Sequence, residues 1–422
     1  MKYGLEITIV KGDRMAKVYF DNSATTQVDP EVVKEMLPYF TEKYGNASSL
    51  HAFGREAYIA MESAREKVAK AIGASSKEII FTSGGTESDN LAIQGYVNAN
   101  KEKGKHIITC TVEHHAVLNT CQFLEKEGFS VTYLPVDAEG MVSVEELKKA
   151  ITKETILVTI MAANNEIGTI APFREIGAIA REHGAVFHTD AVQAITKVPI
   201  EVNKDNIDLL ALNGHKFHGP KGVGALYVRK GVRLKPQVYG GGHERGLRSS
   251  TENVPGIVGL GKAIEIGMAN MDESVEKMKA MRDKLIDGPL ASISYSYLNG
   301  HRTKRLCNNA HFRFDFIEGE SLILQLDMKG FAASTGSACS SKSLEPSHVL
   351  TALGIRQEQS HGSLRVSLSR MNTMDEVKQF LEVLPVVVAQ LREMSPIKTW
   401  EDYSLRGDDH HEEEEECHTA NE

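Results

Sequence analysis

Lys216 is the residue of this sequence that is best placed to act as a nucleophile. It follows the apolar, strand-like run 207–212 and precedes a glycine-rich turn, where a flat ligand can approach the backbone. A lysine that is partly removed from water loses its proton more readily, and the neutral amine can form a Schiff base. An ordinary surface lysine after a strand shows the same local pattern, so this segment alone leaves both interpretations open.

Other polar residues follow neighbouring predicted strands, at the strand ends where open parallel sheets bind ligands. The glycine loop 83–87 opens a helix, and the free N–H groups of a helix N-terminus suit a phosphate. Asp190 ends a buried strand, where a carboxylate needs a positively charged partner such as a protonated ring nitrogen. The ring of His114 is suited to stacking on a planar ligand, and the polar segment 164–168 ends a further apolar strand.

Taken one at a time, these residues have commoner explanations, because helix caps and core histidines show the same residue types. Taken together, they supply a phosphate cradle, a carboxylate for a ring nitrogen, a stacking imidazole and a Schiff-base lysine. Those are the parts that a pyridoxal phosphate enzyme requires. Their placement at successive strand ends therefore predicts a site for that cofactor.

The elements that must position these residues alternate between helix and strand from about residue 52. Apolar residues at three- and four-residue spacing over 53–72 predict an amphipathic helix that stops at Gly73. The later apolar runs lack strict alternation and are separated by helices, which is typical of a parallel sheet covered on both faces. The predicted strands are 78–82, 106–111, 129–134, 155–161, 185–189 and 207–212, and helices begin at 86, 114 and 173.

A long helical stretch, about 255–285, leads from this α/β sheet domain into short strands and helices that end near residue 400. We interpret the second part as a smaller α+β domain. The expected domains are a large cofactor-binding domain, 29–262, and the small domain, 263–405. A segment expected to pack with the small domain, 15–28, precedes them, and an acidic, disordered tail, 406–422, follows them. Residues 1–14 are expected to be an N-terminal extension, with Met15 as a second possible start.

Composition narrows the class of protein. No apolar run is long enough to span a bilayer, and 41% hydrophobic and 25% charged residues are typical of a globular chain. The five cysteines are widely spaced without a C-x-x-C pair, which argues against a disulfide framework or a structural zinc site and favours a reducing cytoplasm. The net charge of −9 comes mostly from the tail, so the folded part is near neutral and nucleic acid is not an expected partner.

The sequence resembles the cysteine desulfurases of the NifS/IscS type, a class V branch of the aspartate-aminotransferase fold, from about residue 18 to residue 370. Characteristic segments include Thr-Ser-Gly-Gly-Thr-Glu-Ser-Asp-Asn at 82–90 and His-Lys-Phe-His-Gly-Pro-Lys-Gly at 215–222. Further matching segments are 19–26, 45–51, 113–117, 164–168, 188–193, 245–251, 337–339, 344–348 and 365–370. The resemblance implies a PLP fold type I large domain with a mostly parallel seven-stranded sheet, a smaller α+β C-terminal domain, and a homodimer.

The resemblance also implies roles for individual residues. Lys216 would hold the cofactor, Asp190 would keep the pyridine nitrogen protonated, and Gln193 would bond the ring hydroxyl. His114 would stack on the ring and take part in catalysis, while Arg365 would bind the substrate carboxylate. The remaining cofactor contacts would come from Gly85, Thr86, Asn165 (which would also contact substrate), Asn213, His215, and Thr251 of the second subunit.

Two positions depart from the family pattern. Asn213 stands where a small hydroxyl residue usually binds the phosphate, although an amide N–H can donate in its place. Ser250 replaces the glycine that usually precedes the phosphate-binding threonine, which constrains the loop if a positive φ is needed there. We expect weaker cofactor affinity from these changes and no loss of function.

Cys339 lies in the small-residue segment 334–343, which we expect to be exposed and mobile. By resemblance, its thiolate attacks the sulfur of bound L-cysteine, which gives a Cys339 persulfide and L-alanine. The length of the loop 331–345 favours the subgroup that feeds iron–sulfur scaffold proteins, and other sulfur acceptors remain open. No resident metal site is expected, apart from transient ligation of a cluster by Cys339.

Two alternatives remain at this level. The first is another class V reaction on the same cofactor, such as that of an aminotransferase, a selenocysteine lyase or a kynureninase. The second is a scaffold-binding subunit whose catalytic site has decayed, which the intact set of Lys216, Asp190, Gln193 and His215 argues against.

Overall fold

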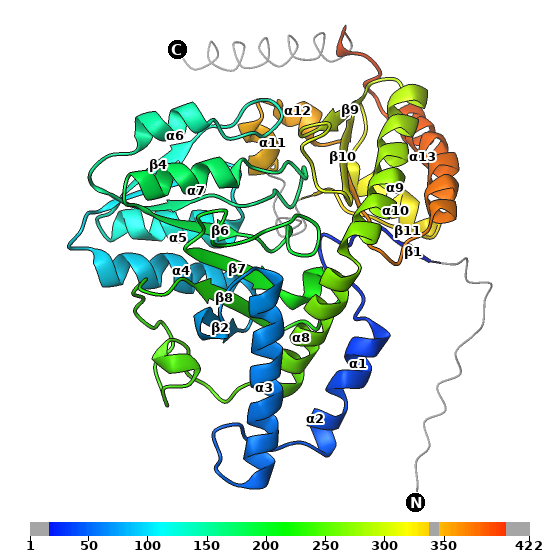
Figure 1. Ribbon diagram of the computed structural model, residues 1–422. Helices are drawn as coiled ribbons and strands as arrows, with labels where there is room; N and C mark the ends of the chain where they lie inside the picture. Colours follow the sequence, from blue (N-terminus) through cyan, green and yellow to red (C-terminus); the bar gives the residue numbers. More distant parts are fainter. Residues whose placement is uncertain (1–16, 337–345, 402–422) are drawn as a thin grey trace, which may run out of the picture.

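The computed structural model describes residues 17–336 and 346–401 (Figure 1). The expectations for the N-terminal extension, for Cys339 and for the acidic tail concern residues outside these ranges. The described chain is an α/β structure with a large central sheet and a smaller antiparallel sheet beside it.

The central sheet has seven strands in the order β2-β8-β7-β6-β5-β3-β4, and β8 alone runs antiparallel to its neighbours. The predicted mostly parallel seven-stranded sheet is therefore confirmed. Strand β8, which follows directly on the glycine-rich turn after Lys216, was not predicted from the sequence. The strands are β2 Ile79–Thr82, β3 His106–Cys110, β4 Ser130–Leu134, β5 Thr155–Thr159, β6 Val186–Asp190, β7 Leu209–Asn213 and β8 Gly224–Val228.

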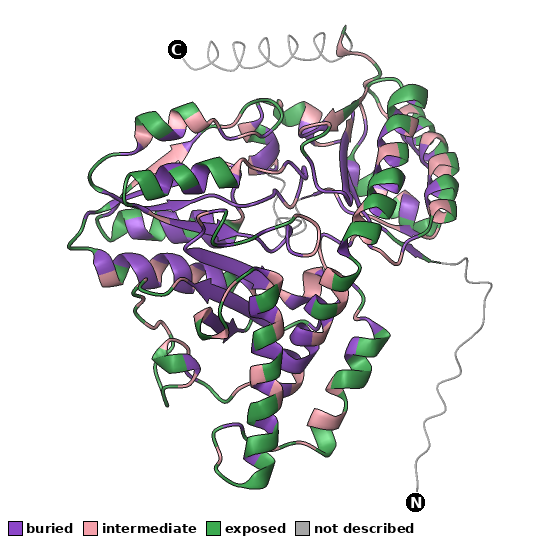
Figure 2. Ribbon diagram, viewed as in Figure 1, coloured by how far each residue is buried: buried purple, intermediate pink, exposed green. Residues whose placement is uncertain are grey.

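Both faces of this sheet are buried except at the edge strand β4, which explains the continuous apolar runs in the inner strands (Figure 2). Leu210 and Leu212 of β7 belong to the core under α3, α7 and α8, whereas Leu209 faces the core under α4 and α5. The two layers thus fix the sheet between them. The helices are α3 Ala52–Ala71, α4 Gly85–Asn100, α5 His115–Lys126, α7 Phe173–Glu182 and α8 Val254–Ala269, with the short α1 Pro30–Met36, α2 Pro38–Thr41 and α6 Val144–Ala150 outside them.

The predicted helical stretch 255–285 is divided at Asn270 into α8 and α9 Met271–Ser292. While α8 packs against α3 of the large sheet unit, α9 packs against α13 Met374–Met394 of the smaller one. The smaller unit is built on the antiparallel sheet β12-β10-β9 and has its own apolar core. The strands of that sheet are β9 Ser296–Asn299, β10 Asn309–Phe314 and β12 Ser363–Ser367, and the helices α10 Gly319–Met328 and α12 Gln357–Ser360 lie beside it. The short helix α11 His348–Ala352 instead contributes Val349 and Leu350 to the core of the larger unit.

The N-terminal segment joins the two units. Its strand β1 Val18–Tyr19 pairs with β11 Phe331–Ala332 of the smaller unit, and residues 21–26 then cross to the carboxyl ends of the central strands. Among the residues that the structure describes, no helix combines the length and the apolar composition that a membrane span needs.

Candidate active site

A cavity of about 250 Å³ lies where the central strands end and the N-terminal segment crosses over them. It brings together residues that are as far apart in the sequence as Gly85 and Arg365. Every predicted site residue within the described ranges lines this cavity except Thr251. The predicted residues that line it are Gly85, Thr86, His114, Asn165, Asp190, Gln193, Asn213, His215, Lys216 and Arg365.

Lys216 occupies the last position of the 3₁₀ turn Gly214–Lys216, directly after β7. Its Nζ donates to the carbonyl oxygens of Ser23 and Ala24, at 2.6 and 2.8 Å. Burial lowers the pKa of the Lys216 amine to about 8, and the positive charges of Arg365 and Lys197 act in the same direction. A much larger share of this amine is therefore neutral near physiological pH than for an ordinary lysine.

Asp190 ends β6, and one of its carboxylate oxygens accepts a hydrogen bond from the Val192 N–H at 2.9 Å. Burial raises the pKa of this carboxyl, although His114 and Lys216 partly offset the effect. Gln193 donates from Nε2 to the Ser23 carbonyl at 3.0 Å. Its Oε1 is buried and has no hydrogen-bond partner among the described residues, so the cavity contains an acceptor that a ligand hydroxyl can satisfy.

The N-terminus of α4 enters the cavity at Gly85 and Thr86, and no side chain caps it. A Cβ added at Gly85 would lie 2.8 Å from Cγ2 of Val192, so glycine is required for this close approach. Asn213 lies against the same turn, and its buried Oδ1 lacks a partner within the described structure. Free N–H groups and the helix dipole make this end of the cavity suitable for an anion.

His215 bonds Thr25 through Nδ1 at 3.1 Å, and burial lowers the pKa of its ring to about 4. Thr251 is exposed and lies outside the cavity lining. The preceding Ser250 has φ 136°, a conformation that glycine adopts more readily than serine. This positive φ is the condition under which the sequence predicted that a serine side chain constrains the loop.

His114 caps the N-terminus of α5. Its Nδ1 accepts the Ala116 N–H at 3.1 Å, so the proton of the neutral ring resides on Nε2. The ring lines the cavity together with His115 and His348. A neutral His114 in this tautomer is therefore a proton donor through Nε2.

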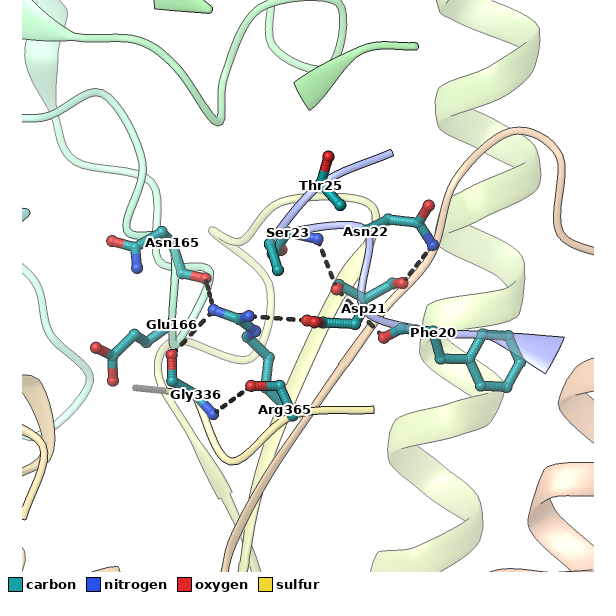
Figure 3. Close-up of polar contacts among 12 residues, drawn as sticks. Phe20, Asp21, Asn22, Ser23, Thr25, Asn165, Glu166, Gly336 and Arg365 are labelled. Atoms are coloured by element: carbon teal, nitrogen blue, oxygen red, sulfur yellow. Dashed lines mark hydrogen bonds and ion pairs between the residues drawn. The ribbon is translucent and has the colours of Figure 1, made fainter. Parts of the chain in front are cut away.

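Arg365 projects from β12 towards the N-terminal segment (Figure 3). Its Nη1 donates to the carbonyl oxygens of Asn165 and Gly336, both at 3.1 Å, and its Nη2 bonds Asp21 at 2.9 Å. The side chain is only 3% exposed. A buried guanidinium at the edge of the cavity suits the recognition of a carboxylate.

Two buried acidic residues were given no role from the sequence: Asp89 of the cavity lining, and Glu113, which lies outside that lining. Asp89 lines the cavity from α4, with its Oδ1 3.5 Å from Nε2 of His188. Glu113 accepts from the Met161 N–H at 2.7 Å, and burial raises its pKa to about 8. Asp89 follows Thr86 by three residues on one helix, so helical periodicity from the phosphate loop was the signal that would have located it.

The side chains present fit pyridoxal phosphate. They supply a largely neutral lysine, a carboxylate at a strand end, an amide oxygen without a partner, and an uncapped helix N-terminus within one cavity. Each of these matches a different part of the cofactor: the aldehyde, the ring nitrogen, the ring hydroxyl and the phosphate.

Residues 18–380 match the family model described as Aminotransferase class-V. This chain belongs to the class-V aminotransferase family. It is 60% identical over 380 residues to the cysteine desulfurase IscS of Methanosarcina thermophila, covering 90% of this chain and 94% of the relative. It is 58% identical over 389 residues to the cysteine desulfurase IscS of Clostridium botulinum strain Hall, covering 92% and 98%.

Solved structures agree with the sequence comparisons. A NifS-like protein superposes on this class-V chain with a TM-score of 0.84 and 42% identity, over 89% of this chain and all of the other. A structure described as SspA in complex with cysteine superposes with a TM-score of 0.75 and 38% identity, over 85% of this chain and all of the other. The protein is accordingly a class-V enzyme of the cysteine desulfurase type, with pyridoxal phosphate as its cofactor.

Proposed function

We propose that the cavity around Lys216 is the active site in which L-cysteine is converted to L-alanine, with its sulfur transferred to Cys339. The observation that carries this proposal is the convergence of ten of the expected residues on one cavity. The bound cofactor would be held covalently by Lys216, and it would draw electrons away from the α-carbon of the substrate. The other steps belong to side chains of the protein.

Proton transfer is assigned to Lys216 and His114. The free Lys216 amine would act as the base that removes the α-proton of the substrate, and its pKa of about 8 suits a group that must gain and lose a proton near neutral pH. His114, with its proton on Nε2, would supply the proton that the substrate carbon takes up once the sulfur has been transferred. Asp190 would hold the protonated ring nitrogen, and Arg365 would hold the substrate carboxylate.

Sulfur transfer is assigned to Cys339, which lies outside the described residues. Its thiolate would attack the substrate sulfur, so that an S–S bond forms while the C–S bond breaks with its electron pair remaining on carbon. Protonation of that carbon yields alanine, and the sulfur remains on Cys339 as a persulfide for an iron–sulfur scaffold protein or another acceptor. A thiolate nucleophile suits a reducing compartment such as the cytoplasm, and Cys110, Cys121 and Cys307 are free thiols.

A homodimer is part of the proposal. Exposed apolar side chains gather on α1, α2 and the first part of α3, at the lower end of the molecule in Figure 1. We call Val33, Leu37, Phe40, Tyr44, Leu50 and Phe53 the α1–α3 patch. Leu50 is 91% exposed, which is costly for an isolated subunit and typical of a protein interface. Because Thr251 lies outside the cavity of its own subunit, it is available to the cavity of a partner.

The test is the release of alanine and sulfide from L-cysteine by the wild-type protein and by Lys216→Ala and Cys339→Ala variants. We expect Lys216→Ala to abolish both products. Cys339→Ala should abolish sulfur transfer while the protein keeps its bound cofactor. Alanine formation at the wild-type rate by Cys339→Ala would favour a different class V reaction.

A further inference from the structure

Arg365 lines this cavity as a buried cation, and it already carries a carboxylate partner. Asp21 lies 2.9 Å from its Nη2, and this is the only ion pair that Arg365 makes within residues 17–336 and 346–401. Removing a cation from water is costly unless an anion compensates it. Asp21 therefore balances Arg365 as long as the cavity holds no other anion.

Asp21 is not needed to hold the guanidinium in place. Nη1 of Arg365 is fixed by two backbone carbonyl oxygens, those of Asn165 and Gly336 (Figure 3). Nε of Arg365 is buried and has no hydrogen-bond partner among the described residues. A carboxylate that binds side-on to a guanidinium takes Nε and Nη2 together, and Nη2 is the atom that Asp21 contacts.

Asp21 can also give way without leaving a buried charge of its own. Its side chain is 20% exposed, compared with 3% for Arg365. It stands two residues before Ser23, whose carbonyl oxygen accepts from Lys216, so the same chain segment contacts both the reactive amine and the guanidinium.

We propose that Asp21 is a stand-in for the α-carboxylate of the substrate, competing with that carboxylate for Arg365 and so setting the affinity of the site for amino acids. This proposal rests on the proposed role of Arg365 as the carboxylate-binding residue. An incoming carboxylate gains the interaction with Arg365 but weakens the one with Asp21, so that its net affinity is lower than a bare guanidinium would give. The product L-alanine carries the same α-carboxylate, so competition from Asp21 lowers its affinity as well. The lower affinity assists the release of the product.

The test uses Asp21→Asn in the holoenzyme. Asparagine keeps an oxygen that can accept a hydrogen bond from Nη2 of Arg365, but it removes the negative charge. The variant therefore removes competition with the substrate carboxylate while it preserves the hydrogen bond that orients the guanidinium. We expect the dissociation constant of L-alanine, measured by calorimetry, to fall by roughly fivefold or more, and KM for L-cysteine to fall with it. A residue with a merely structural role would instead weaken alanine binding when it is changed.

Asp29→Asn is the matched control. Like Asp21, Asp29 lies near the N-terminus and forms an ion pair with an arginine. Its partner is Arg370, three residues after the end of β12. Asp29 thus pairs with an arginine other than Arg365, and Arg370 does not line the cavity of about 250 Å³. Alanine affinity should therefore be unchanged in Asp29→Asn, and thermal melting of both variants checks that they fold. If Asp21→Asn does not fold, Asp21→Ser offers a smaller neutral acceptor for the same measurement.

Unchanged or weaker alanine binding in a folded, neutral Asp21 variant overturns the proposal. Arg365→Gln distinguishes this failure from failure of the proposed function. If Arg365→Gln binds alanine as the wild type does, Arg365 is not the carboxylate-binding residue and the proposed function is wrong at that point. If Arg365→Gln no longer binds alanine and Asp21→Asn binds it no more tightly than the wild type, the role of Arg365 stands. Only the proposed role of Asp21 is then wrong.

Discussion

At the scale of the residue, the chemistry depends on how the protein alters the proton affinity of one amine. Lys216 donates to two backbone carbonyl oxygens, and after burial the positive charge of Arg365 is the next largest cause of its lowered pKa. Burial is the larger cause of its lowered pKa, so the effect is built into the fold and does not require a bound ligand.

The first prediction concerns the pH dependence of this amine. Only the neutral amine attacks an aldehyde, and the lowered pKa places the transition at about 8. We expect the rate at which cofactor-free protein captures pyridoxal phosphate to rise with pH through about 8 and then to level off. Stopped-flow absorbance measures this rate. A rate that keeps rising to the pKa of an ordinary lysine, about 10.4, would contradict the lowered value.

The sequence predicted the residues of the cavity better than it predicted their interactions. Lys216 and Asp190 were recognisable because each ends an apolar strand, and strand ends meet at one edge of a parallel sheet. Asp21 and Asp89 were not singled out, because their roles arise from contacts with Arg365 and His188, which are distant in the sequence. Helical periodicity could have placed Asp89 on the same face as Thr86, but neither periodicity nor spacing identifies the distant residue that each carboxylate contacts.

At the scale of the elements, a buried ion pair ties α3 to the loop that leads to Thr251. Arg65 of α3 forms two hydrogen bonds with Glu244, at 2.7 and 2.8 Å, and both side chains are 4% exposed. Glu244 also accepts from the N–H of Phe81 in β2 at 2.7 Å. One carboxylate therefore joins a helix, a strand and a loop.

The second prediction is that Glu244→Ala destabilises the protein by about 3–5 kcal/mol, because it leaves the Arg65 charge buried and unpaired. Chemical denaturation measures the loss. Glu62→Ala is the control, since Glu62 contacts the same guanidinium at 2.8 Å but is 30% exposed and should cost less than about 1 kcal/mol. Equal losses of unfolding free energy in the two variants would show that the buried ion pair stabilises the protein no more than the partly exposed one.

The elements themselves followed largely from the sequence. Strands β3, β5 and β6 were predicted within about two residues, because apolar runs bounded by helices have few other interpretations. The strand β8 was missed because it lies antiparallel at the end of a glycine-rich turn. The break at Asn270 was missed because both halves of the helix are internally regular, and only packing on different units separates them.

At the scale of the whole molecule, two units enclose the cavity and the N-terminal segment links them. Arg365 comes from the smaller unit and Lys216 from the larger one, so the site exists only when both are in place. The α1–α3 patch lies on the larger unit, away from the antiparallel sheet (Figure 1). The proposed dimer would cover this patch.

The third prediction is that Leu50→Asp combined with Phe40→Asp converts a dimer into monomers, because two charges would then enter an apolar interface. Light scattering after gel filtration measures the mass. The cofactor should also be retained less well, since Thr251 is expected from the partner. Leu324→Asp, at a 65% exposed position on α10, is the control and should leave the mass unchanged. A wild-type protein that is monomeric would refute the dimer directly.

The central claim is that sulfur from L-cysteine reaches Cys339 while alanine is formed. The most direct measurement is one turnover of the holoenzyme with L-cysteine in the absence of any reductant, followed by mass spectrometry of the peptide that contains Cys339 and assay of free alanine. We predict one added sulfur atom on that peptide for each alanine released. Alanine released without added sulfur on Cys339 would contradict the account.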